Sequence, residues 1–387
     1  MTNLERSANQ LANDDTQCDG GAQEGSSQTS ATMQTLAELL SRFGYGEYYP
    51  CFNPLAPRRE SWLHYRDHAP KKLHSLIDLF ILNERVAPTD LAQPFQDIVE
   101  PLILSGLLRK DEEDGSVFLP GLVILPVWGN WLICQAPTVN PTLYFGDDST
   151  ALLNRLRPKV GGTCLDLCAG PGVQSLHCAR FAGQTTAVEV NPAAAWLAGL
   201  NVQINGLTER MRVLHGDLYA PVAGQQFDTI VANPPLLPFV EDIAYPFVGH
   251  GGADGLRVTR RILYGLPEAL TAAGTAQLIG TTLSDGLLPL CSDELTDWAR
   301  EADMDIMMTL TTQQPLKPGL LYFEGLVDTA TVSSGKQRDE VSAAFLESLC
   351  SQEASHLCAY FLHVTRGSGA FDLLDVTEGE QPGLWYV

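Results

Sequence analysis

The stretch from Gly161 to Phe239 constrains the fold most, because short apolar runs alternate in it with helical patterns. Thr163 to Leu167 is apolar without alternation, as expected of a parallel strand buried on both faces. A turn holding Gly170 and Gly172 follows, and an apolar helical pattern continues from Val173 to Phe181. The stretch therefore predicts a strand, a glycine turn and a helix N-terminus, an arrangement in which backbone comes close to a bound nucleotide.

The next three strand ends of this stretch carry side chains that suit a nucleoside ligand. Glu189 lies near the carboxyl end of the second strand, where a carboxylate can accept both ribose hydroxyls. Asp217 follows the third strand, where a short acid reaches an exocyclic amine of adenine. Asn233 to Leu236 ends the fourth, and its two prolines stiffen the backbone there. A glycine turn with a downstream acid also suits nicotinamide or flavin, but a dinucleotide dehydrogenase has no need of the Asn-Pro-Pro corner.

With these residues the sequence resembles the class I S-adenosylmethionine (SAM) methyltransferases. It looks most like the branch with an Asn-Pro-Pro motif, which includes the release-factor glutamine N5-methyltransferases and the small-domain methyltransferases. The resemblance covers about Tyr144 to Thr282 and implies a Rossmann-like, seven-stranded α/β sheet with SAM as the methyl-donating cosubstrate. It implies a cofactor site made of Tyr144, Phe145, Asp166, Cys168, Ala169, Gly170, Gly172, Glu189, Val190, Asn191, Asp217, Leu218 and Asn233. It implies that Asn233, Pro234, Pro235 and Leu236 hold the group to be methylated.

Two positions depart from the family pattern. Cys168 stands where the first glycine of the loop usually is, and Leu236 stands where the branch usually has Tyr or Phe. An aromatic ring at the second position would stack on a flat amide or base. Its absence points away from a nucleobase and leaves an aliphatic or apolar acceptor open.

The rest of the chain predicts two further regions. Residues 1–32 are polar and poor in large apolar side chains, which predicts a disordered tail. Residues 33–140 predict a mainly helical domain followed by a hairpin, with the outline of a winged helix. Its turn Asp111 to Gly115 is acidic, so we interpret the domain as a cap or a homodimerisation module. Residues 141–387 would be the SAM-binding domain, with an insertion at about 311–356 between the sixth and seventh strands.

Composition excludes several classes of protein. The chain has 24 basic and 46 acidic residues among 387, a net charge of -22, which disfavours binding to nucleic acid phosphates. Nine cysteines without a paired framework suit a reducing cytoplasm, and no apolar stretch is long enough for a membrane span.

His64 and His68 lack a third ligand, so no metal site is predicted. The glycine-rich segment Gly249 to Gly255 is predicted to act as a mobile lid over the site, and His250 within it is a candidate catalytic base.

The corner at Asn233 favours nitrogen methylation, because an amide oxygen and a proline-fixed carbonyl can together accept hydrogen bonds from an NH2 group. We therefore expect a SAM-dependent methyltransferase acting on a small metabolite or a protein side chain. Three alternatives stay open. They are an RNA or DNA amine methyltransferase, an enzyme that transfers the aminocarboxypropyl group or cyclises SAM and releases methylthioadenosine, and a module that only senses SAM.

Overall fold

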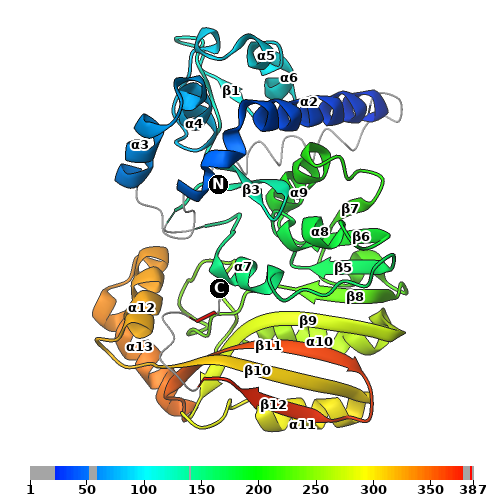
Figure 1. Ribbon diagram of the computed structural model, residues 1–387. Helices are drawn as coiled ribbons and strands as arrows, with labels where there is room; N and C mark the ends of the chain where they lie inside the picture. The colour runs from blue at the N-terminus through cyan, green and yellow to red at the C-terminus, as the bar shows by residue number, and fades with distance from the viewer. Residues whose placement is uncertain (1–21, 52–58, 139–140, 378–383, 386–387) are drawn as a thin grey trace.

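A single mixed sheet forms the centre of the fold (Figure 1). The structure is a computed structural model that describes residues 22–51, 59–138, 141–377 and 384–385. The strands lie in the order β12-β10-β11-β9-β8-β5-β6-β7. Their bounds are β5 (Thr163–Leu167), β6 (Gln184–Glu189), β7 (Met211–His215), β8 (Phe227–Ala232), β9 (Leu270–Ser284), β10 (Met304–Pro315), β11 (His356–Arg366) and β12 (Phe371–Asp375). β11 runs antiparallel between β9 and β10, as predicted for the seventh strand of the family fold.

The sheet has eight strands, one more than the seven that were expected. β12 pairs in parallel with β10 at the edge of the sheet. Asp305 explains the extra strand, because its carboxylate accepts hydrogen bonds from the backbone N–H groups of Ser368 and Ala370 and so turns the chain back along β10. Further along the chain, Trp385 is buried against Phe361 of β11.

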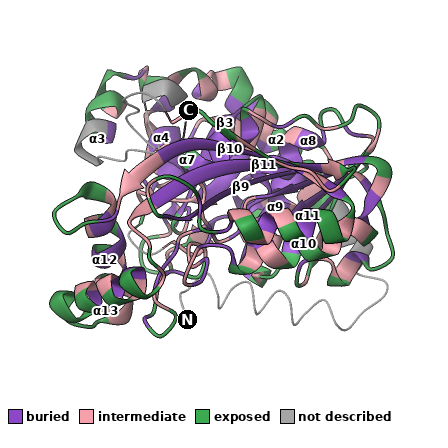
Figure 2. Cartoon of the chain, turned by 90° about the horizontal axis from the view of Figure 1, so that it is seen from below, coloured by how far each residue is buried: buried purple, intermediate pink, exposed green. Residues whose placement is uncertain are grey.

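Helices cover both faces of the sheet. One face carries α7 (Asp147–Leu153), α8 (Val173–Cys178) and α9 (Pro192–Ile204), and the other carries α10 (Arg257–Ala269) and α11 (Ser292–Ala302). Along β5, Leu165 and Leu167 pack with α10 and α11, whereas Cys164 packs with α7 and α8. Figure 2 shows the strands buried between these layers. The unalternated apolar pattern of the strands follows from burial on both faces.

The N-terminal region is built from one long helix, several short helices and two hairpins. Its elements are α2 (Ala22–Phe43), η1 (Tyr45–Cys51), α3 (Arg59–His68), η2 (Lys71–Leu73), α4 (His74–Phe80), η3 (Pro88–Asp90), α5 (Gln93–Gln96), α6 (Val99–Leu104), β1 (Arg109–Lys110), β2 (Val117–Phe118), β3 (Leu122–Val127) and β4 (Asn130–Gln135). α2 begins ten residues before the end of the predicted tail, and residues 1–21 lie outside the described residues. Among the described residues no helix is both long and apolar enough to cross a bilayer.

The N-terminal region packs on α9. Side chains of α2 such as Leu36 and Leu40 share one core with Leu197 of α9. Asn201, also on α9, exchanges hydrogen bonds with the backbone of Ile133 in β4, at 2.7 Å and 2.8 Å. Because the buried Asn201 amide replaces a strand partner for β4, this hairpin is fixed to the sheet domain.

The predicted insertion contains two helices, of which only the second was expected. α12 (Leu321–Ser334) and α13 (Arg338–Ser351) follow the end of β10. Their inner side chains pack on the segment after β8, where the ring of Phe239 stacks on that of Phe345 with centroids 4.7 Å apart. The helical pair therefore supports the chain that follows the Asn-Pro-Pro corner.

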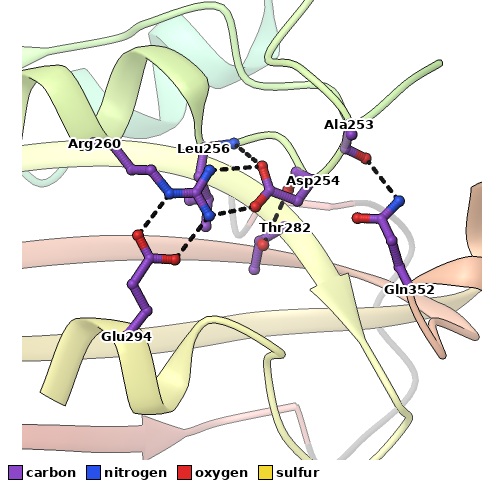
Figure 3. Close-up of polar contacts among 7 residues, drawn as sticks. All are labelled: Ala253, Asp254, Leu256, Arg260, Thr282, Glu294 and Gln352. Carbon is purple, nitrogen blue, oxygen red and sulfur yellow. Dashed lines mark hydrogen bonds and ion pairs between the residues drawn. The ribbon is translucent and has the colours of Figure 1, made fainter. Parts of the chain in front are cut away.

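The segment Gly249 to Leu256 is held in place by polar contacts (Figure 3). The Arg260 guanidinium bridges the carboxylates of Asp254 and Glu294, with its shortest contacts at 2.5 Å and 2.6 Å. The backbone oxygen of Asp254 also accepts a hydrogen bond from the Thr282 hydroxyl at 3.0 Å. These contacts favour a fixed wall over the mobile lid that the glycine content predicts.

Glycine in this segment permits close approach. Gly255 has a φ of +86°, and a Cβ there would lie 2.4 Å from the Thr281 oxygen and 2.7 Å from the Leu236 oxygen. The backbone of the segment can therefore lie directly on the corner after β8 only because no side chain intervenes.

Replacing Arg260 by Ala should lower the free energy of unfolding by about 1–2 kcal/mol, because two partly buried carboxylates would face each other without a cation. Faster hydrogen exchange at the amides of residues 249–256 should accompany the loss. Chemical denaturation and hydrogen exchange measure the two effects.

Arg300→Ala is the matched control, since Arg300 pairs with Asp297 on the surface, where both side chains are about two-thirds exposed. Its change should stay within about 0.5 kcal/mol. Equal stability and exchange in Arg260→Ala and the wild type would show that the ion bridge does not hold the segment.

Candidate active site

A cavity of about 330 Å³ lies at the carboxyl ends of β5, β6, β7 and β8. In a parallel sheet these ends meet at one edge, which is where ligands bind in open α/β folds. Twelve of the predicted residues line the cavity: Tyr144, Cys168, Ala169, Gly170, Glu189, Val190, Asn191, Asp217, Leu218, Asn233, Pro234 and Pro235. The structure thus brings together residues spread over more than ninety positions of sequence.

The turn after β5 adopts left-handed backbone at three positions. Cys168 has a φ of +58°, Gly170 of +54° and Gly172 of +85°. Gly172 caps α8 and faces Ala198 of α9 at contact distance, so it is not itself part of the cavity wall. The position of Cys168 is one that favours glycine, which explains why the family usually has glycine there.

Glu189 is fixed by the backbone around it. Its two carboxylate oxygens accept hydrogen bonds from Gly170 N at 2.8 Å and Asn191 N at 2.7 Å. Burial raises the pKa of this carboxyl, although the backbone donors act in the opposite direction. Each oxygen keeps a second lone pair for a ligand hydroxyl.

Asp217 forms an ion pair that the sequence did not predict. Arg261 on α10 reaches it from the opposite wall at 2.6 Å, and both side chains are about half exposed. Arg257 and Arg261 both line the cavity, so α10 contributes a basic wall. Their spacing of four residues places them on one helix face. This spacing indicates a cavity wall only once the orientation of α10 is known.

Asn233 is held by residues from α7. Its Nδ2 donates to Asp148 Oδ2 at 3.0 Å and lies 3.3 Å from Ser149 Oγ. Asp148 is 8% exposed, and burial raises its pKa to about 6. Asn233 Oδ1 is buried and accepts no hydrogen bond from any described residue. Asp148 and Ser149 also line the cavity. Neither was predicted as a site residue, because no local pattern shows that α7 lies beside Asn233.

Four predicted residues do not line the cavity: Phe145, Asp166, Gly172 and Leu236. Leu236 is 6% exposed and packs in the core with Ala169 and Ile279, so its side chain does not face an acceptor. Asp166 is 1% exposed, and burial raises its pKa to about 7. Ser175 donates to one of its oxygens, whereas Oδ1 accepts no hydrogen bond from the described part of the chain.

His250 lines the cavity, but its hydrogen bonds do not suit a base. Its Nδ1 accepts the backbone N–H of Gly252 at 3.1 Å, and a nitrogen of Arg257 lies 3.3 Å from the same atom. Because Nδ1 acts as the acceptor, the neutral ring carries its proton on Nε2. The ring therefore presents a donor at its remaining nitrogen.

Comparison with known proteins agrees with this architecture. Residues 130–279 match the family model described as methyltransferase small domain. A "putative protein N5-glutamine methyltransferase" of Methanocaldococcus jannaschii is 32% identical over 152 residues, which cover 38% of this chain and 76% of that protein. The chain belongs to the class I SAM-dependent methyltransferases of the Asn-Pro-Pro branch.

Two other relatives match this methyltransferase over only part of their length. The ribosomal protein uL3 glutamine methyltransferase of Bradyrhizobium diazoefficiens is 36% identical over 141 residues, covering 34% of this chain and 44% of the relative. The release factor glutamine methyltransferase of Moorella thermoacetica is 33% identical over 138 residues, covering 33% and 49%. The chain thus spans less than half the length of these two relatives.

SAM is the cosubstrate of this family, and the cavity of the methyltransferase fits it. The Glu189 carboxylate suits ribose hydroxyls, whereas Asp166 lies outside the cavity wall. Asp217 keeps one oxygen outside its ion pair with Arg261 for an adenine amine. We propose these two roles, for Glu189 and Asp217, in binding of the cosubstrate.

Glu189→Ala should raise the Kd for SAM about tenfold to a hundredfold, because hydrogen bonds to a charged carboxylate are lost. Isothermal titration calorimetry measures the Kd. Glu301→Gln is a suitable control, since Glu301 is exposed on α11 outside the cavity. An unchanged Kd in Glu189→Ala would contradict the assignment of the ribose site.

Proposed function

We propose that this methyltransferase transfers the methyl group of SAM to the side-chain amide nitrogen of a glutamine in a protein. The observation that carries the proposal is the state of Asn233 at the cavity wall. Its Nδ2 is already bound to Asp148, while its Oδ1 is free to accept a hydrogen bond. An acceptor NH2 group is the complement of a free amide oxygen.

Methyl transfer from SAM requires the protein mainly to place the acceptor nitrogen in line with the methyl group. SAM supplies a methyl group that is activated by a positively charged sulfur. Asn233 Oδ1 and the Pro234 carbonyl would accept both N–H groups of the acceptor amide, which orients its nitrogen toward the methyl group. The buried walls exclude water, and no strong base is required if the proton leaves after methyl transfer. His250, as an Nε2 donor, suits the carbonyl oxygen of the acceptor amide.

A protein acceptor is preferred to a small metabolite because relatives carry the names ribosomal protein uL3 and release factor glutamine methyltransferase. A nucleic acid acceptor fits less well, since the chain has a net charge of -22, which disfavours contact with phosphates. A cytoplasmic location follows from the same proposal, because translation proteins act there.

The test incubates the protein with methyl-labelled SAM and purified uL3, release factors or the protein fraction of a cell extract. Digestion and mass spectrometry should find a methylated glutamine together with S-adenosylhomocysteine. Label in RNA, no label in protein, or methylthioadenosine formed from SAM alone would contradict the proposal.

Asn233→Ala should lower turnover about a hundredfold while the Kd for SAM changes little, because the acceptor loses its oxygen partner. Single-turnover kinetics and calorimetry separate the two effects. Wild-type turnover in this variant would show that Asn233 does not hold the acceptor.

We also propose that residues 33–140 form a module of their own, either a cap for the acceptor or a homodimer interface. The core shared by α2 and α9 supports a fixed attachment of this module to the sheet domain. Light scattering after size-exclusion chromatography distinguishes the two roles, since an interface requires a dimer and a cap does not.

A further inference from the structure

The Asn233 side chain is a carboxamide whose two ends have opposite hydrogen-bonding character. One end is an acceptor oxygen and the other is an NH2 donor, and which end faces the acceptor decides what the site can bind. The two ends have nearly the same shape, so packing alone does not select one orientation. A polar neighbour must make the selection.

Asp148 is that neighbour. It lies at the N-terminal end of α7, 8% exposed, with Oδ2 3.0 Å from Asn233 Nδ2. An ionised carboxylate has only acceptor oxygens, so the end of Asn233 that faces it must be the NH2 group. The oxygen end then points elsewhere, and it is the buried Oδ1 that no described residue binds.

Asp148 is itself fixed. The backbone N–H of Ser149 donates to its Oδ1 at 2.8 Å, and the Tyr144 hydroxyl also bonds to the carboxylate. Its two oxygens are therefore committed to different donors. An asparagine at this position has a single side-chain oxygen. That oxygen could take the place of only one of the two Asp148 oxygens, which accept from Ser149 N and from Asn233 Nδ2.

We propose that Asp148 is a positioning residue that selects the orientation of the Asn233 carboxamide, so that Oδ1 faces the acceptor NH2 group. Ser149 Oγ, 3.3 Å from Asn233 Nδ2, accepts from the same NH2 group, but a hydroxyl also donates and so does not select an orientation by itself. This inference rests on the proposed function for its catalytic consequence, but the orientation itself can be measured without an acceptor.

Protonation would weaken this selection, because a carboxylic acid can donate to an amide oxygen as well as accept from NH2. Burial and the neighbouring Asp147 hold the pKa of Asp148 at about 6, above the ordinary value. Other titratable or charged groups near this corner are Tyr144, Tyr245 and Tyr322, and His250, Arg257 and Arg261 line the same cavity. Asp148 is therefore ionised at neutral pH, and the selection fades as the pH falls through about 6.

The kinetic test compares Asp148→Ala and Asp148→Asn with the wild type, using the glutamine acceptor found in the assay above. Asp148→Ala should lower kcat/KM for the acceptor about tenfold to a hundredfold, which corresponds to one charged hydrogen bond. The Kd for SAM should change little, and Asp148→Asn should retain more activity than Asp148→Ala. Wild-type kcat/KM should fall below pH about 6, and Asp148→Asn should lack that decrease.

Asp147→Asn is the matched control, since it removes the same charge one residue away on an exposed side chain. It should keep wild-type turnover at pH 8. Thermal denaturation of every variant identifies any that fails to fold. Wild-type kcat/KM and an unchanged pH profile in both Asp148 variants would overturn the proposal.

The second test needs no acceptor. In protein labelled with 15N-asparagine, the side-chain NH2 signals of Asn233, identified by their loss in Asn233→Asp, should shift with a midpoint near pH 6. They should not shift in Asp148→Asn. Signals that are the same in both proteins at every pH would overturn the proposal, whether or not a glutamine is methylated.

Discussion

The meeting of four parallel strand ends at one edge of the sheet is the constraint on which the rest of the structure depends. β5, β6, β7 and β8 are hydrogen-bonded as parallel neighbours, so their carboxyl ends open on the same cavity. Each end delivers one functional element, and the backbone near each end is fixed by the sheet.

The acceptor corner needs more support than the sheet alone gives. Beyond β8 the chain leaves the ladder at Asn233, and two prolines cannot donate backbone hydrogen bonds. The missing support comes from three directions. The segment around Gly255 lies against the Leu236 carbonyl, the Thr281 hydroxyl donates to that carbonyl, and α7 holds the Asn233 amide through Asp148. Gly255 permits close contact between two backbone segments, whereas the glycine content of this segment had suggested a flexible lid.

Sequence reasoning predicted those parts of the molecule whose signals are local. The four strands, the glycine turn and Glu189 follow from apolar runs and from residue types at strand ends, and the antiparallel position of β11 follows from the family topology. Asp148 and Arg261 were missed because each acts across the cavity from a distant element, and no local pattern marks such a partner. Leu236 was assigned to the site because its place in the motif does not reveal that its side chain turns into the core. β12 and α12 were not predicted either. An edge strand and a peripheral helix are stabilised by contacts with residues that are far away in the sequence.

In the proposed reaction, an acceptor carboxamide meets Asn233 Oδ1 in the cavity that also holds the cosubstrate. A crystal structure with S-adenosylhomocysteine and a glutamine peptide tests it most directly. The sulfur should lie at the glycine turn, the ribose at Glu189, and the glutamine nitrogen within hydrogen-bond distance of Asn233 Oδ1 and the Pro234 carbonyl. A peptide bound away from Asn233, or an Asn233 amide that turns its NH2 group toward the glutamine, would contradict it.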